Sequence, residues 1–528
     1  MAAGAAVTAT ATPALGQLLG QQVFPTNNPW NQNISAAPVA ANSAAIISSI
    51  GATVHFHPDW GTDSPTNGAN PLYGIPYNVV HGNSVAKVSV VIDNYPGESD
   101  IVPMPIPVNA VIEGDYQNGP NPNGAGYNNG QRGDSHLIVW DQDNNIDYEL
   151  YAATRPSDPY LFDGVTPHTD GKWHAAQETV WNFNTNDFRP LGYTSADAAG
   201  LPILAGLVRP EEGLPANQGG LGAINHALRM TLGSSIVSKQ YIYPASHIVT
   251  RSGQVPFGAR FRLMSTPTVN NLIATMGPQA QVIARAMQQY GLILADIGSS
   301  MFVTGASASG NATNQLELVW NMNDVLTLNQ LSASNFEVVD LTPVVSGLSA
   351  SNGAAGSSLI ITGKNFSGAA GHLSVFFGTN AAQFVNVFGD SQVSVIVPGG
   401  SGTVDVKVQS GAYEPDTYDS PGANVKEPIF GDGTSALTPA DKFTYAVGSP
   451  VAPTIQRMAT VGGNFIMGGT NNSGLTGTYH VLTSTNLVLP LTNWAVLTNG
   501  SFDSKGNFSF TNAIGTANPK LFYRLRVP

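Results

Sequence analysis

The sequence lacks cysteine and is poor in charged residues. None of its 528 residues is Cys, which excludes disulfide frameworks, thiolate nucleophiles and cysteine-ligated zinc sites. Only 10% of the residues are charged, and the formal net charge of −13 would repel a phosphate backbone. Because no run of Lys and Arg counters this charge locally, we expect no nucleic-acid partner.

Long apolar stretches and common catalytic motifs are also missing. No segment approaches the ~20 apolar residues that cross a bilayer, so we expect no membrane span. The opening segment MAAGAAVTATATPALG lacks the basic start and continuous apolar run of a signal peptide. There is no GxSxG elbow, HExxH helix, P-loop or strand-linked GxGxxG, and no ExDxxE strand of the kind found in jelly-roll β-glucanases.

The chain length and the abundance of turn-forming residues indicate the number of domains and the fold class. At 528 residues the chain exceeds the roughly 250–300 residues that one hydrophobic core supports, so we expect several domains. Gly, Pro, Asn, Ser and Thr are plentiful, whereas the helix formers Glu, Lys and Arg are scarce. This balance favours strands joined by many turns, and the fold class that we predict is mainly β.

The largest domain is predicted over residues 23–341, after an Ala- and Thr-rich lead over residues 1–22 that we expect to be disordered. Its apolar runs, such as VAKVSVVID and FGARFRLM, are cut by Gly, Pro and Asn, which favours a jelly roll or β-sandwich with a few helices. One helix is predicted from Pro278 to a cap at Gly291. The segment that follows it, LILADIGSSMFVTG, predicts a hairpin.

The character of the chain changes at Pro343. Gly356 before SLIITGKNF, and then FFGTNAA, VIVP and VDVKV, follow in order. With these features, residues 343–446 resemble an IPT/TIG domain. The resemblance implies an immunoglobulin-like β-sandwich that accompanies secreted and surface proteins and contributes no catalytic residues.

A last β-rich module is predicted over residues 455–528. Its segments TYHVLTSTNLVLPLTNWAVL and FYRLRVP resemble small C-terminal modules of secreted proteins from environmental bacteria. On the basis of these two modules we expect a secreted or cell-surface protein, with the modules serving as spacers or as surface attachment.

The segment DSHLIVWDQDNNIDYELYAA, which begins at Asp134, predicts a hairpin with a two- or four-residue loop. Either loop places Trp140 opposite Asp147 or Glu149, because side chains alternate along a strand. One face then carries polar and aromatic residues, and the other face is apolar. An ordinary solvent-facing strand pair is the alternative, but exposed Trp and Tyr beside acids are uncommon on such a surface.

More polar residues follow in TSADAAGLPILAGLVRPEEG, INHALRMT and KQYIYPASH. The first segment contains Asp197, Arg209 and Glu212. A structural alternative is that Asp197 caps a short helix and that Arg209 pairs with a Glu. In the second segment His226 and Arg229 alternate in facing, so at most one of them is expected to face a cleft.

Histidines are concentrated in the large domain, where eight of the ten lie before residue 250. In HFHPD, His55 and His57 share a strand face, as metal ligands often do. Hydrogen-bonded or surface histidines are the alternative. A structural or catalytic metal of unknown identity is compatible with the sequence, but no cofactor is required.

Several short segments of the large domain carry a family resemblance. They are HPDWG, GIPYNVV, PMPIP, VIEGD, DSHLIVWD, YELYAA, TSADAAGLPILAGLVRPEE, INHALRMT, YIYPASH, FGARFRL and YGLILADIGSSMFVTG. Together they resemble an uncharacterised family of secreted bacterial proteins. The resemblance covers roughly residues 23–341. It implies a self-standing exported unit and supplies no mechanism.

The leading hypothesis is a secreted polysaccharide-active enzyme, a glycoside hydrolase that uses paired carboxylates. Asp134 and Glu149 are the first acid and base candidates, and Asp197 and Glu212 come next. The expected partner is a polysaccharide or oligosaccharide. The residues expected to contact it, by stacking, by orienting it or by relaying protons, are His136, Trp140, Tyr151, Trp181, Arg209, His226, Arg229 and His247.

Two other functions are consistent with the same residues. In a polysaccharide lyase, a Tyr or His removes a proton beside a uronic carboxylate that Arg229, Arg209 or a metal neutralises. The third hypothesis is a carbohydrate-binding or adhesive surface protein without catalysis.

Overall fold

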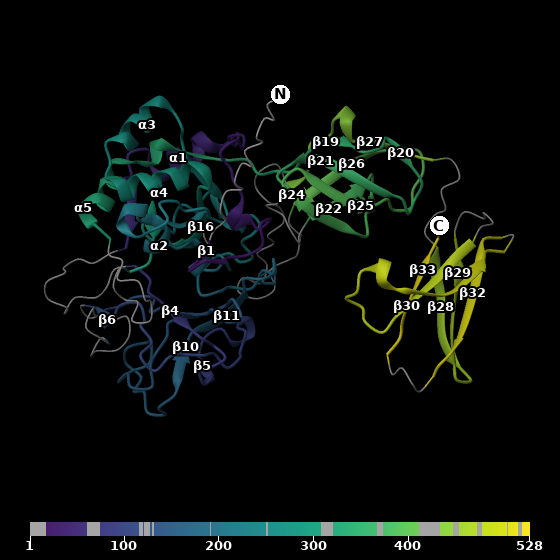
Figure 1. The fold of residues 1–528 in the computed structure, drawn as a ribbon, viewed down its shortest axis with the longest axis horizontal. Helices are drawn as coiled ribbons and strands as arrows, with labels where there is room; N and C mark the ends of the chain where they lie inside the picture. The colour runs from purple at the N-terminus through teal and green to yellow at the C-terminus, as the bar shows by residue number, and fades with distance from the viewer. Residues whose placement is uncertain are drawn as a thin grey trace, which may run out of the picture. The chain divides into compact units, whose positions relative to one another are not determined.

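Figure 1 shows the chain in a computed structural model that is mainly β, as predicted. The chain divides into two compact units, one that contains the residues up to Thr342 and one that contains most of the residues from Pro343 onward. The structure describes residues 17–60, 74–115, 120, 127–128, 131–190, 192–249, 252–307, 320–366, 373–410, 433–446, 453–471, 478–503, 505–515 and 520–527.

The large unit is built on two sheets with mixed strand directions. The four-stranded sheet has the order β11-β9-β8-β4, and the six-stranded sheet has the order β18-β15-β16-β12-β17-β3. The first sheet consists of β4 (Tyr77–Val80), β8 (Leu137–Asp141), β9 (Ile146–Tyr151) and β11 (Gln177–Asn182). The second consists of β3 (His57–Asp59), β12 (Leu228–Leu232), β15 (Arg260–Leu263), β16 (Leu292–Ile297), β17 (Phe302–Thr304) and β18 (Phe336–Val338).

Smaller strand pairs and helices complete this unit. The pairs are β1 (Gln17–Leu18) with β2 (Gln21–Gln22), β5 (Val90–Ile92) with β10 (Trp173–Ala175), β6 (Tyr127–Asn128) with β7 (Gln131–Arg132), and β13 (Val237–Tyr241) with β14 (Val255–Phe257). The helices are α1 (Ser43–Ile50), α2 (Pro210–Gly213), α3 (Pro267–Ala274), α4 (Pro278–Gln289) and α5 (Met322–Val325). In Figure 1, α1, α3 and α4 gather at one end of the unit, and α1 contacts β18 while α4 contacts β15.

The predicted helix is confirmed. Helix α4 begins at Pro278, and Gly291 just beyond its end has φ +72°, a left-handed conformation that glycine adopts without strain. One face of the helix is buried and includes Ile283 and Met287. Apolar spacing and end signals were therefore sufficient here.

The predicted hairpin after α4 is wrong. Strands β16 and β17 lie in the same sheet, but β12 lies between them, parallel to β16 and antiparallel to β17. The predicted disordered lead also ends earlier than residue 22, because residues 17–22 form β1 and β2 and Leu18 is fully buried. The rest of the lead lies outside the described residues.

The second unit begins with an immunoglobulin-like sandwich, as predicted. One sheet has the order β19-β21-β25-β24 and the other β20-β27-β26-β22-β23. Their strands are β19 (Val344–Leu348), β20 (Asn352–Gly353), β21 (Ser358–Lys364), β22 (Leu373–Phe377), β23 (Asn380–Ala381), β24 (Val385–Gly389), β25 (Gln392–Ile396), β26 (Thr403–Ser410) and β27 (Lys442–Tyr445). Alternate residues such as Leu359 and Ile361 are buried, which is the pattern of strands with one inward face.

The C-terminal part of this unit has two three-stranded sheets, β28-β29-β32 and β31-β30-β33. The strands are β28 (Thr454–Val461), β29 (Asn464–Thr470), β30 (Thr478–Ser484), β31 (Ala495–Ser501), β32 (Asn507–Ala513) and β33 (Phe522–Arg526). Tyr479, Phe508 and Phe510 belong to a small aromatic core. Across the described residues of both units, every helix is too short or too polar to traverse a bilayer.

Candidate functional site

The β8–β9 hairpin has the predicted facing. A four-residue loop over residues 142–145 places Trp140 opposite Asp147 and Ile138 opposite Glu149. The predicted polar and aromatic face therefore forms. Asn145 in the loop has φ +53°, a conformation that Asn tolerates better than most residues.

The central part of this face is buried and does not line a cleft. Trp140 is 0% exposed and Trp181, on the neighbouring strand β11, is 1% exposed, and both belong to the main core of the unit. Because neither ring is accessible, the expectation that they stack on sugar is wrong. The opposite face is covered as well, since Leu137 and Leu150 belong to a second core.

Glu149 is buried and holds the backbone of a neighbouring segment. Its carboxylate accepts hydrogen bonds from the backbone N–H groups of Ile203 at 2.7 Å and Leu204 at 2.9 Å, and from Trp181 Nε1 at 3.2 Å. Burial and the Glu149 carboxylate raise the pKa of Asp147 well above its usual range. The structure thus corrects the assignment of Glu149 as an accessible acid, because all of its side chain is enclosed.

Arg209 and its partners form a second buried network. Arg209 lies 3.2 Å from Glu211 and 3.1 Å from Glu212, and His226 Nε2 lies 2.8 Å from Glu212. All four side chains are almost inaccessible. The structural alternative for Arg209 is therefore the observed one, and the roles expected for Arg209, Glu212 and His226 at a substrate are corrected.

His247 is also buried and hydrogen-bonded to the backbone. It is 3% exposed, and its Nδ1 lies 2.8 Å from the backbone oxygen of Ala198. Burial places it outside any accessible surface, so the expected contact between His247 and substrate is also corrected.

The remaining predicted residues lie together at the end of the hairpin and beside the six-stranded sheet. His136 Nδ1 lies 2.7 Å from Glu113 Oε2, and its Nε2 lies 3.0 Å from the backbone oxygen of Ala196. Since both partners are acceptors, both ring nitrogens donate and the ring is an imidazolium. Burial lowers the pKa of His136, but Glu113 outweighs it and the pKa rises to about 9.

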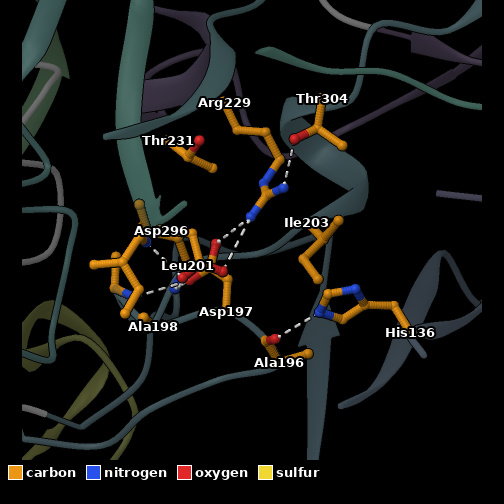
Figure 2. Close-up of polar contacts among 12 residues, drawn as sticks. His136, Ala196, Asp197, Ala198, Leu201, Ile203, Arg229, Thr231, Asp296 and Thr304 are labelled. Carbon is orange, nitrogen blue, oxygen red and sulfur yellow. Dashed lines mark hydrogen bonds and ion pairs between the residues drawn. The ribbon is translucent and has the colours of Figure 1, made fainter. Parts of the chain in front are cut away.

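Arg229 on β12 connects two carboxylates to this region. As Figure 2 shows, its guanidinium is directed at Thr304 on one side and at two acids on the other. Nη1 donates to Thr304 Oγ1 at 2.9 Å, while Nη2 lies 3.5 Å from Asp197 Oδ2 and 3.6 Å from Asp296 Oδ2. Arg229 is only 3% exposed, so the two acids compensate a buried charge, and the expected contact between Arg229 and substrate is corrected.

Asp197 and Asp296 differ in accessibility. The Asp197 side chain is fully buried, and its Oδ1 accepts backbone N–H groups of Ala199 at 3.0 Å and Leu201 at 3.1 Å. Asp197 therefore caps a turn, close to its predicted structural alternative, and its expected role as an accessible catalytic acid is corrected. The Asp296 side chain is 19% exposed at the end of β16. Burial raises the pKa of Asp197 to about 6, and burial together with the charge of Asp197 raises that of Asp296 to about 7.

Asp134 and Tyr151 complete the accessible side. Asp134 is exposed, and its pKa is raised by partial burial of the carboxyl and by Glu113, against the opposing effect of His136. The Tyr151 ring lies 5.8 Å from the His136 ring, and burial and Asp134 raise its pKa to about 12. Asp59, at the end of β3, is also coupled electrostatically to Glu113 and Arg229.

Three acids of this cluster were not among the candidates predicted from the sequence. Asp59, Glu113 and Asp296 lie in HPDWG, VIEGD and LILADIG, which come from separate parts of the chain. Asp296 lies near the end of the apolar strand β16, and that position is the available signal, whereas Asp59 ends the short polar strand β3. The sheet that unites them could not be assembled from local patterns.

The HFHPD histidines do not converge on a metal site. His57 stacks on Phe302 with ring centroids 4.0 Å apart, and His55 Nδ1 lies 2.8 Å from the backbone oxygen of Asn329. In the part of the chain that the structure describes, no third ligand joins them.

The sandwich of the second unit matches a known domain family. Residues 343–421 match the IPT/TIG domain family. This segment is an IPT/TIG domain. No curated protein matches the chain.

Solved structures resemble parts of the chain weakly. The auxiliary nutrient binding protein from Bacteroides thetaiotaomicron is 16% identical over 21% of this chain and 21% of its own, with a TM-score of 0.15. The gamma-CGTase from alkalophilic Bacillus clarkii is 14% identical over 37% and 25%, with a TM-score of 0.15. The glucan utilization protein SGBP-B from Bacteroides ovatus, solved with a mixed-linkage heptasaccharide, is 10% identical over 37% and 54%, with a TM-score of 0.13.

In each case the chain spans less than two thirds of the solved structure. TM-scores of this size say nothing about fold or activity.

Proposed function

We propose that the large unit is a carbohydrate-active enzyme that hydrolyses glycosidic bonds by general acid–base catalysis at Asp134 and Asp296. We further propose that the protein acts outside the cell. The carboxyl of Asp296 carries the proposal. It is accessible, and its pKa of about 7 keeps a large fraction protonated near neutral pH.

The environment of these two acids separates their roles. The charge of Asp134 contributes to raising the pKa of Asp296, so the first acid to ionise keeps the other protonated. Asp296 then donates a proton to the leaving oxygen. Asp134 acts as the base that activates water or as the nucleophile.

The surrounding residues support this arrangement. Arg229 contacts Asp296 and Asp197 from the buried side and fixes the Asp296 carboxyl. Tyr151 is half-buried beside His136 and is the predicted aromatic residue that remains available for sugar stacking. His136 and Glu113 form a partly buried ion pair that interacts electrostatically with Asp134.

Two observations count against lyase chemistry. The guanidinium of Arg229 is already occupied by two acids and Thr304, so it is not free to neutralise a uronic carboxylate. The raised pKa of Tyr151, about 12, makes this phenol a poor base at neutral pH.

The test is a screen for reducing ends and products with the full chain, on plant, algal and bacterial polysaccharides, with and without a chelator. We expect Asp296→Asn and Asp134→Asn each to lower kcat by at least about 100-fold. Asp187→Asn removes an exposed acid outside the site and serves as the control, with unchanged activity expected.

Three results would overturn the proposal. Retention on a polysaccharide without new reducing ends indicates a binding protein. Unsaturated products indicate a lyase. Full activity of Asp296→Asn on a substrate that the wild type degrades removes Asp296 from the chemistry.

A further inference from the structure

A second cluster of ionisable residues lies in the segment before and within β10. His168 Nε2 lies 3.1 Å from Asp170 Oδ1, and His174 Nε2 lies 3.2 Å from both carboxylate oxygens of Asp170. The candidate ligand atoms of these three residues all lie within 4.8 Å of one another. The His168 side chain is 1% exposed and that of His174 is 10% exposed, whereas Asp170 is 41% exposed.

The other nitrogen of each ring determines where the protons are. His168 Nδ1 lies 3.2 Å from the backbone oxygen of Asp158, and His174 Nδ1 lies 3.0 Å from Asp93 Oδ2. A carbonyl oxygen and a carboxylate can only accept, so both Nδ1 atoms carry hydrogen. In the neutral rings both Nε2 atoms then present lone pairs, and both are directed at the carboxylate of Asp170.

This arrangement needs a positive charge at its centre. Three groups of lone pairs that face one another repel unless a cation or two additional protons lie between them. Lys172 Nζ lies 3.9 Å from Asp170 Oδ2, and its backbone N–H donates to Asp170 Oδ1 at 3.0 Å. These contacts reach Asp170 alone and supply no positive charge between the two Nε2 atoms.

We propose that His168, Asp170 and His174 bind a divalent transition-metal ion of the Zn²⁺ class. Two imidazole nitrogens and one carboxylate oxygen are a ligand set that suits Zn²⁺. Ligand atoms about 2.0–2.1 Å from a tetrahedral ion lie roughly 3.3 Å apart, and the Nε2–Oδ separations of 3.1 and 3.2 Å match that spacing closely.

The contacts of the two Nδ1 atoms are those of metal-bound histidines. Such rings commonly donate their second N–H to a carboxylate or a backbone carbonyl, which fixes the tautomer and the ring orientation. Asp93 and the Asp158 carbonyl occupy these positions. Three protein ligands leave the fourth position of a tetrahedral ion for water or another ligand, and the partial exposure of Asp170 gives solvent access to the cluster.

The site would join two parts of the large unit. His174 lies on β10, which pairs with β5, and Asp93 follows β5 directly. His168 comes from the preceding loop and is tied to Asp158. Bound metal therefore fastens this loop to the β5–β10 pair and should stabilise the folded unit.

The experiment is isothermal titration of chelator-treated, tag-free full chain with ZnCl₂, together with the visible spectrum of the Co²⁺-loaded protein. We expect one equivalent of metal and the absorption bands of tetrahedral Co²⁺. The thermal midpoint should rise with Zn²⁺. His174→Asn and the milder, exposed Asp170→Asn should each weaken binding at least 10-fold.

The matched control is His81→Asn, which removes an exposed histidine paired with a single carboxylate, Asp143, at 2.8 Å. It should bind zinc as the wild type does. Absence of stoichiometric binding, or equal binding by His174→Asn, Asp170→Asn and the wild type, would overturn the metal site. An NMR spectrum with doubly protonated His168 and His174 in the presence of Zn²⁺ would instead establish a metal-free ion-pair cluster.

Discussion

His136 and Glu113 form an ion pair, with 2.7 Å between Nδ1 and Oε2, at the edge of the candidate site. The histidine side chain is 4% exposed and its second nitrogen is also occupied by an acceptor. His136 is therefore an imidazolium whose charge Glu113 balances, although histidine is usually neutral in such a buried position.

The ion pair predicts a specific pH dependence of stability. The pKa of His136 is raised to about 9 in the folded protein, so its contribution is fully present below the unfolded value near 6.5 and is lost as pH rises through 9. The pKa of Glu113 is lowered, so its contribution is lost in acid. Glu113→Gln should cost roughly 3 kcal/mol at pH 6 and much less at pH 9.5.

Urea unfolding followed by tryptophan fluorescence measures this difference, because Trp140 and Trp181 are buried in the large unit. The exposed pair of His81 and Asp143 provides the comparison, and Asp143→Asn should change stability little at either pH. An equal loss for Glu113→Gln at both pH values would mean that packing, not charge, explains it.

The pH dependence of hydrolysis should follow Asp296. Because this acid must be protonated to donate, kcat/KM should fall as pH rises through about 7. Asp197 raises the pKa of Asp296, so Asp197→Asn should move this fall to lower pH. Asn retains the oxygen that accepts from Ala199 and Leu201, which preserves the turn. A shift to higher pH would contradict the proposed coupling.

Local patterns predicted the strands but not what covers them. The alternation in the β8–β9 hairpin correctly placed Trp140 opposite Asp147. Whether that face meets solvent depends on packing by Trp30, Phe183 and other distant residues of the main core. A buried Glu149 that binds Ile203 and Leu204 looks in the sequence like an accessible acid, because its partners are backbone groups.

The candidate site also combines residues from distant parts of the sequence. Asp134, His136 and Tyr151 are close in the sequence and were found together. Asp296 joins them through β16, whose neighbour β12 carries Arg229. A strand inserted between β16 and β17 leaves no local trace, which is why a hairpin was predicted there.

Glu149 should be important for stability and unimportant for chemistry. Glu149→Gln replaces one acceptor oxygen with an amide donor among the N–H groups of Ile203, Leu204 and Trp181, so it should cost about 1–3 kcal/mol. Folded Glu149→Gln should keep the wild-type KM and kcat. Selective loss of kcat in a well-folded variant would return Glu149 to the catalytic residues.

Asp147 provides the contrasting variant. Its pKa is raised well above the unfolded value, so the contribution of this carboxyl to stability is lost as pH rises above about 4. Asp147→Asn removes that penalty. We expect unfolding free energies at pH 7 equal to or above those of the wild type, measured in the same urea titrations. A large loss at pH 7 would show that an ionised Asp147 is needed.

Arg229 should stabilise the unit mainly by compensating Asp197 and Asp296. Arg229→Met leaves the buried Asp197 and the partly exposed Asp296 without their cation and should cost about 3–5 kcal/mol at pH 8. Without Arg229 the pKa values of both acids rise further above their unfolded values, because Arg229 lowers both. An acid whose pKa is raised in the folded protein loses its contribution to stability as pH rises. The free energy of unfolding lost through Arg229→Met should therefore be smaller at pH 5 than at pH 8.

A double variant separates charge from packing at this position. Arg229→Met combined with Asp197→Asn removes one of the uncompensated acids, so it should be more stable at pH 8 than Arg229→Met alone. Arg229→Lys should be intermediate, because one ammonium cannot reproduce the separate contacts of Nη1 with Thr304 and Nη2 with the two acids. If Arg229→Met were equally destabilised at pH 5 and pH 8, and the double variant recovered nothing, the guanidinium would be acting through its packing. The proposed electrostatic control of Asp296 would then have no basis.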